Sequence, residues 1–336
     1  MQISALVATT LAFGIAGIAS GQETMPQQAR EATRTANAGY DAMPDTKGTG
    51  PYAAVKLSDP GLPDHLIYRP RDPASLGKRK LGVLVWGNGA CSDDAASARL
   101  HLAEIASHGY VVIAPGRALS GPGAPPRQQL PHAPGPLGVK TVTAQVSAGI
   151  DWALAENNRR SSPLYHRIDP SMVAVSGHSC GGLQALLVAA DPRIHAVIIH
   201  NSGVFKDNSN PIQGMTIAKS ALKALHTPVL YVMGGPTDIA WANGNDDFDL
   251  IDHVPAAIVS LPVGHGGTFN DANGGRVTQV DVAWLDWQFR HDARAAHWFK
   301  GADCRLCTTA PWTIRKKHID VEHGEAKGPV TQGYQG

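Results

Sequence analysis

From about residue 64 onward, short hydrophobic runs alternate with longer stretches in which apolar residues recur at helical spacing. Each run has the length of a strand and little polar alternation, which is typical of strands buried on both faces. Strands of this kind separated by helices predict an α/β fold, with a mostly parallel, doubly wound sheet that helices cover on both faces. No segment between the strands is long enough for a large cap domain. The predicted strands are residues 66–69, 81–86, 110–114, 172–175, 195–199, 228–233 and 256–261, and the predicted helices are 93–108, 141–157, 181–190, 215–225 and 275–291.

The two ends of the chain depart from this pattern. Residues 3–19 are an apolar run followed by Ala19-Ser20-Gly21, which favours a signal peptide over residues 1–21, although the run carries no Lys or Arg before it. An N-terminal membrane anchor is the alternative. We expect a polar N-terminal arm over 22–62, the α/β domain over 63–312 and a polar C-terminal tail over 313–336.

One internal stretch, residues 115–138, is rich in glycine and proline and too irregular for a helix. It follows the end of a predicted strand, where binding sites of parallel sheets form. It is either a wall of a substrate site or a solvated surface loop.

Charge and hydropathy narrow the function classes. The 336 residues carry a formal net charge of +1 at pH 7, so the chain lacks the basic footprint of a nucleic-acid-binding protein. No stretch after the N-terminus is apolar enough to span a bilayer, so we expect no membrane span in the mature chain. Together with the signal peptide, these features favour a secreted or periplasmic protein.

The strand at 172–175 runs into Gly177-His178-Ser179-Cys180-Gly181, and a predicted helix follows at once. A Gly-x-Ser-x-Gly between a strand and a helix is typical of a sharp turn that exposes a nucleophilic serine. The alternative is a glycine-rich turn that merely packs the helix on the sheet. We therefore take Ser179 as the candidate nucleophile.

A serine nucleophile needs a base and an orienting acid, which in this architecture follow it in the order Ser, Asp or Glu, His. Asp238 follows the strand at 228–233, and His265 follows the strand at 256–261, so both should lie at the same sheet edge as Ser179. The rival acids are Asp246, Asp247 and Asp249, and the rival bases are His178, His200 and His253.

An oxyanion in such a site needs two backbone donors. The N–H of Cys180, directly after the serine, is one candidate. Asn88, after the strand at 81–86, is the other, with Gly89 as an alternative. These glycines could also serve the tight turn alone.

The four cysteines favour disulfides in an exported chain. Cys304 and Cys307 form a CxxC whose simplest interpretation is a local structural disulfide. Cys91 lies just past the proposed oxyanion loop, and Cys180 lies just past the serine. Because both loops must converge on one oxyanion, we hypothesise a Cys91–Cys180 disulfide, with two buried free thiols as the alternative.

These motifs resemble the α/β-hydrolase superfamily over about residues 64–310. Within it, the layout is similar to cap-less secreted esterases: cutinase-like polyester hydrolases, PET hydrolases and dienelactone-hydrolase-like enzymes. The shared features are the GHSCGG elbow, the acid after PVLYVMGG, the His265 loop and the stretch VAWL at 282–285. The resemblance implies Ser179 as nucleophile, Asp238 as acid and His265 as base. The chain departs from polyester hydrolases, which usually carry Met at position 180 and Tyr at position 88, and from the dienelactone type, which has a cysteine nucleophile.

The sequence thus predicts a serine carboxylic-ester hydrolase that forms an acyl-enzyme on Ser179 and needs no metal or organic cofactor. Its substrate would be a small-molecule or polymeric ester. A lipase, a peptidase, a carbohydrate-ester deacylase or a non-catalytic binding protein of the same fold are the alternatives. Trp86, Trp241 and Phe269 are near the three candidate loops in sequence and are predicted to wall the substrate site.

Overall fold

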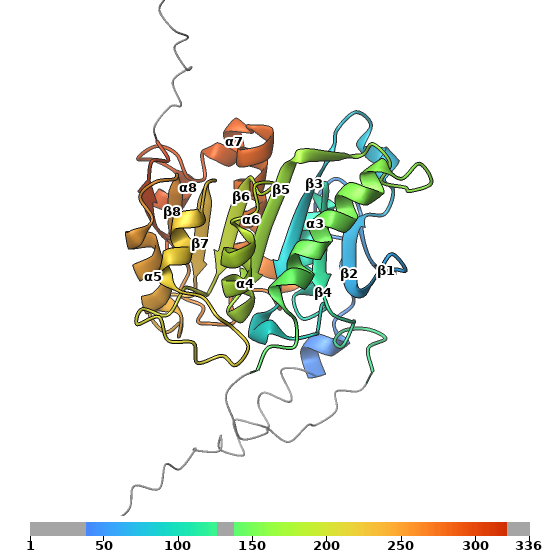
Figure 1. The fold of residues 1–336 in the computed structure, drawn as a ribbon. Coiled ribbons are helices and arrows are strands. Elements are labelled where there is room, and N and C mark those ends of the chain that lie inside the picture. Colours follow the sequence, from blue (N-terminus) through green and yellow to red (C-terminus); the bar gives the residue numbers. More distant parts are fainter. Residues whose placement is uncertain (1–37, 126–137, 321–336) are drawn as a thin grey trace, which may run out of the picture. The chain divides into compact units, whose positions relative to one another are not determined.

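The computed structural model describes residues 38–125 and 138–320, which form one nine-stranded sheet with helices on both faces (Figure 1). Along the sheet the strands follow the order β1-β2-β4-β3-β5-β6-β7-β8-β9. Their bounds are β1 (Ala54–Asp59), β2 (Leu62–Pro70), β3 (Leu81–Gly87), β4 (Tyr110–Pro115), β5 (Ile168–His178), β6 (Ala196–His200), β7 (Val229–Met233), β8 (Ala256–Ser260) and β9 (Thr313–Lys317).

The central strands are parallel and the edges are antiparallel. From β4 through β3, β5, β6 and β7 to β8, every neighbouring pair is parallel. The pairs β1–β2, β2–β4 and β8–β9 are antiparallel. This mostly parallel sheet confirms the predicted fold class. It also brings the carboxyl ends of β3, β5, β6, β7 and β8 to one edge, where ligand sites of such sheets form.

Two layers of helices cover the sheet. In β3, Val83 and Val85 pack with residues of α3 and α4, whereas Leu84 and Trp86 pack with residues of α2 and α6. In Figure 1, α3, α4 and α5 lie in front of the sheet and α6 lies behind it. The described residues contain no large cap domain. The helices are α2 (Arg99–Ser107), α3 (Thr143–Asn158), α4 (Cys180–Val188), α5 (Trp241–Leu250), α6 (Gly275–Arg290), α7 (Ala293–Ala296) and α8 (Arg305–Thr308), with single 3-10 turns at η1 (Pro73–Leu76), η2 (Gly89–Cys91), η3 (Lys219–Ala224) and η4 (Ala272–Gly274).

Burial on both faces explains why the central strands read as continuous apolar runs. All residues of β3, β4, β6, β7 and β8 are buried. With no face left in water, polar alternation along these strands would cost free energy rather than save it. Hydrophobic burial on both sides of the sheet is therefore the main term that holds this architecture together.

The edges and some helices differ from the sequence prediction. The strands β1 and β9 were not predicted, and they extend the sheet beyond both ends of the range 63–312. The helix predicted over 93–108 begins only at Arg99, because Asp94 accepts backbone hydrogen bonds from Ala96 and Leu119 in the preceding turn. The helix predicted over 215–225 is reduced to the 3-10 turn η3, and α5 was missed.

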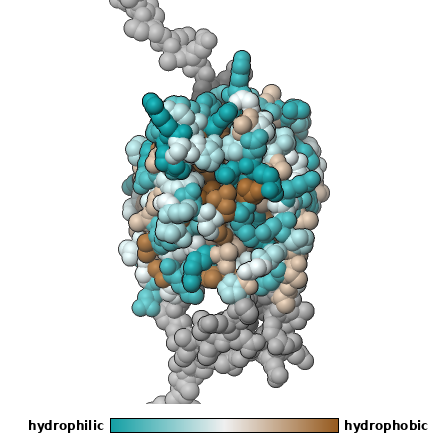
Figure 2. Space-filling view, turned by 90° about the vertical axis from the view of Figure 1, so that its right-hand side faces the viewer, coloured by the Kyte–Doolittle hydropathy of each residue, from teal (hydrophilic) through white to brown (hydrophobic). Residues whose placement is uncertain are grey.

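Polar side chains protect the exposed edge at β1. Figure 2 views the side on which β1 and β2 lie, where hydrophilic side chains surround a smaller group of hydrophobic ones. In β1, Lys56 stands between the apolar Val55 and Leu57 and pairs with Asp45, and Asp59 ends the strand. Charged residues on an edge strand discourage pairing with a second sheet.

No helix in the ranges 38–125 and 138–320 is long and apolar enough to cross a membrane. The predicted signal peptide over residues 1–21 lies outside the described residues.

Candidate active site

Ser179 lies between the end of β5 at His178 and the start of α4 at Cys180. Its backbone adopts φ 53° and ψ −121°, a conformation that non-glycine residues rarely take. Strained backbone of this kind costs of the order of 1–3 kcal/mol and persists only where the surroundings enforce it. The turn therefore has the sharp strand-to-helix geometry that the Gly-x-Ser-x-Gly pattern predicted.

Gly181 lets two backbones approach closely beneath this turn. A Cβ at Gly181 would lie 2.1 Å from the carbonyl carbon and oxygen of Gly87 and 2.6 Å from the backbone oxygen of Asn88. The loop after β3 thus packs directly on the first turn of α4. This contact, rather than turn flexibility alone, requires the glycine.

The structure brings the three predicted catalytic side chains together in one hydrogen-bonded row. His265 Nε2 lies 2.9 Å from Ser179 Oγ, and His265 Nδ1 lies 2.7 Å from Asp238 Oδ1. Asp238 follows β7 and His265 follows β8, so the carboxyl ends of β5, β7 and β8 supply one residue each. Parallel register places these ends at one rim of the sheet.

Asp238 is held as a carboxylate. Burial alone favours its neutral form, but hydrogen bonds from His265, the Ala240 and Gly234 amides and Asn201 outweigh burial and lower the pKa of Asp238 to about 2. An ionised carboxylate only accepts hydrogen bonds, so His265 Nδ1 carries the proton between them. His265 Nε2 then presents its lone pair to the Ser179 hydroxyl.

The rival acids and bases have other partners. Asp246 and Asp247 pair with Lys219, and Asp249 pairs with Arg315. Burial raises the pKa of Asp247 to about 6 against the opposing effect of Lys219. Among the histidines, His178 Nε2 lies 2.8 Å from the backbone oxygen of His265, His253 Nε2 lies 2.9 Å from the backbone oxygen of Leu225, and His200 is fully buried.

The two proposed oxyanion donors lie on segments that pack against each other, since the backbone of Gly87 and Asn88 meets Gly181 in the first turn of α4. Cys180 is the first residue of α4, where backbone N–H groups have no acceptor within the helix. The buried Asn88 side chain donates to the backbone oxygens of Ser92 and Pro115 at 2.9 and 2.7 Å, which fixes the loop that carries its own N–H. The side-chain amide is thus already engaged, which leaves the backbone N–H as the group of Asn88 that could serve an oxyanion.

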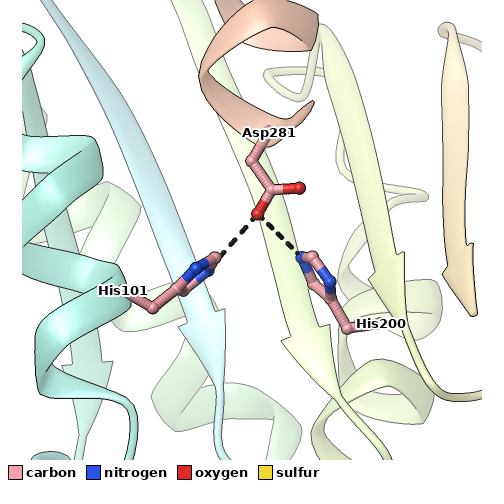
Figure 3. A group of neighbouring side chains, drawn as sticks. All are labelled: His101, His200 and Asp281. Atoms are coloured by element: carbon pink, nitrogen blue, oxygen red, sulfur yellow. Dashed lines mark ion pairs between the residues drawn. The ribbon is translucent and has the colours of Figure 1, made fainter. Parts of the chain in front are cut away.

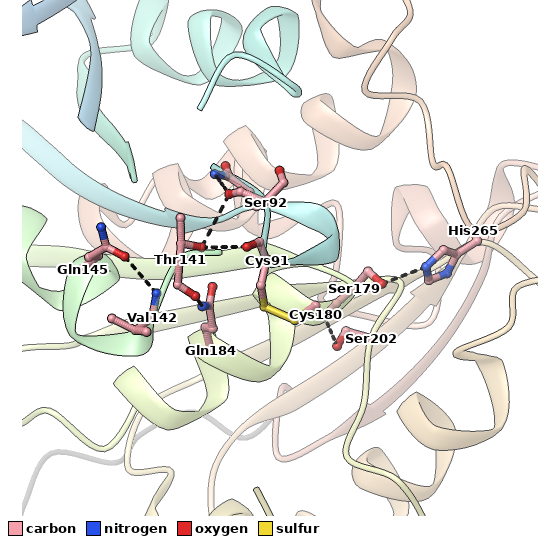
Figure 4. Close-up of a disulfide and its surroundings, with 11 residues drawn as sticks. Cys91, Ser92, Thr141, Val142, Gln145, Ser179, Cys180, Gln184, Ser202 and His265 are labelled. Atoms are coloured by element: carbon pink, nitrogen blue, oxygen red, sulfur yellow. Dashed lines mark hydrogen bonds between the residues drawn. A yellow bond between two sulfur atoms is a disulfide. The ribbon is translucent and has the colours of Figure 1, made fainter. Parts of the chain in front are cut away.

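Both hypothesised disulfides are present. Cys91 and Cys180 are joined with a Cα–Cα distance of 5.2 Å, and Cys304 and Cys307 with 4.9 Å. The first links η2 to the start of α4, directly beside Ser179 (Figure 4). Thr141 donates to the backbone oxygen of Cys91, and Gln184 donates to that of Thr141, so polar contacts surround the bridge.

The predicted aromatic wall needs correction. Trp86 is 1% exposed and Phe269 is 5% exposed, and their rings contact one another in the core. Strand alternation turns Trp86 toward α2 and α6, so neither ring lines a surface cleft. Trp241 is partly buried, and its role in substrate binding stays a prediction. Residues 126–137 of the loop predicted over 115–138 lie outside the described residues.

Two residues directly after β6 support the row Ser179–His265–Asp238, and the sequence pattern did not predict this role. Asn201 Nδ2 donates to Asp238 Oδ2 at 2.8 Å and to the backbone oxygen of Gly264 at 3.2 Å. Ser202 Oγ donates to the backbone oxygen of Ser179 at 2.7 Å. Their place at the carboxyl end of a central strand was the available signal.

The sequence matches no model of a known protein family, and it matches no curated protein.

We expect the two disulfides to differ in their effect on stability. The Cys91–Cys180 bridge spans 89 residues and the Cys304–Cys307 bridge spans 3. The loop-entropy relation gives about 4–5 kcal/mol for the first and about 2 kcal/mol for the second. Guanidinium unfolding of the Cys91→Ser/Cys180→Ser double variant should show the larger loss, with Cys304→Ser/Cys307→Ser as the matched control. Equal losses would contradict this expectation.

Gly181→Ala should lower the free energy of unfolding by about 1–3 kcal/mol, because its Cβ overlaps the Gly87 backbone. Gly266→Ala is the matched control, since a Cβ there meets nothing within 4 Å. Thermal unfolding of both variants measures the difference. A Gly181→Ala protein as stable as the control would show that the close approach is not a constraint.

Proposed function

We propose that this protein is a secreted serine hydrolase of the α/β-hydrolase type that cleaves carboxylic esters through an acyl-enzyme on Ser179. The observation that carries the proposal is the row Ser179–His265–Asp238, with contacts of 2.9 and 2.7 Å and the serine on a strained turn. The strand order and the antiparallel β2 agree with that family's architecture.

In the proposed reaction, the Ser179 oxygen attacks the ester carbonyl carbon while His265 Nε2 takes the hydroxyl proton. Asp238 stays ionised, fixes the Nδ1–H tautomer and stabilises the imidazolium that forms. The resulting oxyanion accepts hydrogen bonds from the backbone N–H groups of Cys180 and Asn88. Collapse of this intermediate breaks the bond to the alcohol, which leaves with the proton from His265.

Water then repeats the sequence on the acyl-enzyme. His265 takes a proton from the water as it attacks, and it returns that proton to Ser179 when the acid leaves. These steps use only side chains and backbone groups of the chain.

Two exposed apolar residues favour a substrate with a hydrophobic group. Ile239 directly follows Asp238 and is 81% exposed, and Val263 lies two residues before His265 and is 40% exposed. Both are close in sequence to the proposed acid and base, and exposed apolar side chains there would suit an apolar acyl or alcohol portion.

The proposed export has independent support. Both cysteine pairs among residues 38–320 are disulfides, which form and persist mainly in oxidising compartments. The apolar segment at residues 3–19 supplies the matching signal-peptide pattern.

Ser179→Ala should lower kcat/KM for p-nitrophenyl esters by about 10⁴-fold or more, since it removes the nucleophile. It should also abolish covalent labelling by a fluorophosphonate probe, while circular dichroism stays unchanged. Ser147→Ala, on the exposed face of α3, is the control and should keep both. Ester turnover or labelling that survives in Ser179→Ala would overturn the assignment. Wild-type protein that takes no label would favour a non-catalytic binding protein.

Activity should fall at low pH because a single group becomes protonated. Protonated His265 cannot accept the serine proton, whereas Asp238, with a pKa of about 2, remains ionised across the same range. A plot of log kcat/KM against pH should therefore rise with a slope of about one on its acid side. A slope near two, or a flat profile down to pH 4, would contradict this mechanism.

A further inference from the structure

Behind the candidate active site, three titratable side chains from distant parts of the chain meet in the core. His101 of α2, His200 at the end of β6 and Asp281 of α6 are each 0% exposed. Figure 3 shows both imidazole rings directed toward the same carboxylate oxygen. Asp281 Oδ2 lies 3.3 Å from His101 Nε2 and 3.0 Å from His200 Nε2. The proposed ester hydrolysis makes no use of this cluster.

The tautomer of His101 follows from its other ring nitrogen. His101 Nδ1 lies 2.7 Å from Thr278 Oγ1, and this hydroxyl donates its only proton to the backbone oxygen of Gly274 at 2.9 Å. With the hydroxyl proton directed at Gly274, Thr278 Oγ1 accepts from His101 Nδ1–H. His101 Nε2 then carries a bare lone pair that faces the carboxylate of Asp281. Two lone pairs in contact repel unless a proton or a cation lies between them.

The contacts have the separations of hydrogen bonds but not their alignment. His101 Nε2, both nitrogens of His200 and both oxygens of Asp281 have no hydrogen-bond partner among the described residues. Ligands about 2.1 Å from one ion lie about 3.0–3.4 Å apart, and each lone pair points at the ion rather than at the neighbouring ligand. The distances of 3.0 and 3.3 Å fit this arrangement.

The charge states suit a cation. A metal binds the neutral form of imidazole, and full burial of both rings disfavours their charged form. Among the described residues, the buried Asp281 carboxylate forms ion pairs with the two histidines and with no Lys or Arg side chain. A divalent ion would supply the missing positive charge.

The surroundings resemble an outer shell of a metal site. Thr278 orients His101, as hydrogen-bonded groups orient metal-binding histidines elsewhere. The rings of Trp86 and Phe269 pack against both imidazoles, with centroids 5.0–5.6 Å away, and exclude solvent. These two aromatic residues, first expected at the substrate, thus enclose the cluster.

We propose that His101 Nε2, His200 Nε2 and Asp281 Oδ2 form a structural site for one divalent transition-metal ion of the zinc class. Two imidazoles and one carboxylate are a ligand set that Zn²⁺ takes. The ion joins α2, β6 and α6 across one face of the sheet. Because the ligands are fully buried, it enters as the chain folds.

The proposed metal site also lies next to Asn201, the residue that supports Asp238 in the row Ser179–His265–Asp238. His200 directly precedes Asn201, whose backbone has a φ of 46° and whose side chain donates to Asp238. An ion that fixes His200 therefore fixes the start of this strained loop. Its role is positional: the backbone oxygen of His200 accepts the Ser179 N–H at 3.0 Å, but no ligand side chain contacts Ser179, His265 or Asp238 in the described interactions.

The test is metal binding by untagged, full-length protein with its disulfides intact. The protein is unfolded in guanidinium with a chelator, freed of metal, and refolded with or without ZnCl₂ or CoCl₂. We expect about one Zn²⁺ per chain by mass spectrometry of the metal content. We also expect a visible Co²⁺ spectrum unlike that of the hexaaqua ion, and a higher melting temperature with metal.

Variants on α6 assign the ion to this cluster. Asp281→Asn should weaken Zn²⁺ binding by about 100-fold or more, and Thr278→Val by about 10–100-fold, because it frees the His101 ring. Asp286→Asn is the matched control, since Asp286 on the same helix bonds Tyr110 and Arg290 instead. It should bind metal as the wild type does.

Wild-type protein that refolds without retaining Zn²⁺ or Co²⁺ would overturn the proposal and leave a proton shared between Asp281 and the histidines. Retention of a full equivalent by Asp281→Asn would overturn it as well. If Asp281→Asn does not fold, the wild-type stoichiometry and the Thr278→Val affinity decide. None of these measurements depends on ester hydrolysis, so they stand or fall separately from the proposed function.

Discussion

The close backbone contact between Gly87, the last residue of β3, and Gly181, in the first turn of α4, is the constraint on which the candidate site depends. It seats the helix against the end of the sheet so closely that Ser179 is left on a turn with positive φ. The Cys91–Cys180 disulfide closes the same junction covalently. Side-chain chemistry at the rim is thus set by backbone packing underneath it, which is how an active site is preorganised.

The core between the sheet and the helices α2 and α6 contains both apolar side chains and a cluster of buried polar ones. Most of it is apolar, as expected for a core built from Leu, Ile, Val and Trp side chains. Near the carboxyl ends of the strands, His101, His200 and Asp281 interrupt it with buried polar atoms. Polar groups at this depth are costly unless they are paired, so they mark a place where the fold serves more than hydrophobic burial.

The parts that the sequence predicted are those encoded locally. Ser179, Asp238 and His265 each follow a buried apolar strand, and strand direction alone brings such positions to one rim. The rest depends on contacts between distant segments. The amide of Asn201 matters only because Gly264 and Asp238 fold against it. Trp86 is close to the site in sequence, but strand alternation directs its side chain to the face of the sheet that α2 and α6 cover. The strands β1 and β9 are polar in composition, so their sequences resemble those of loops.

The antiparallel pairing of β9 with β8 has a consequence for how the molecule is assembled. The strand that precedes the His265 loop lies at an open sheet edge until residues 313–317 have been synthesised, because only then can Ser260 and its neighbours find partners on that side. In chain order, the sheet is therefore completed at the β8 edge by its last strand, β9.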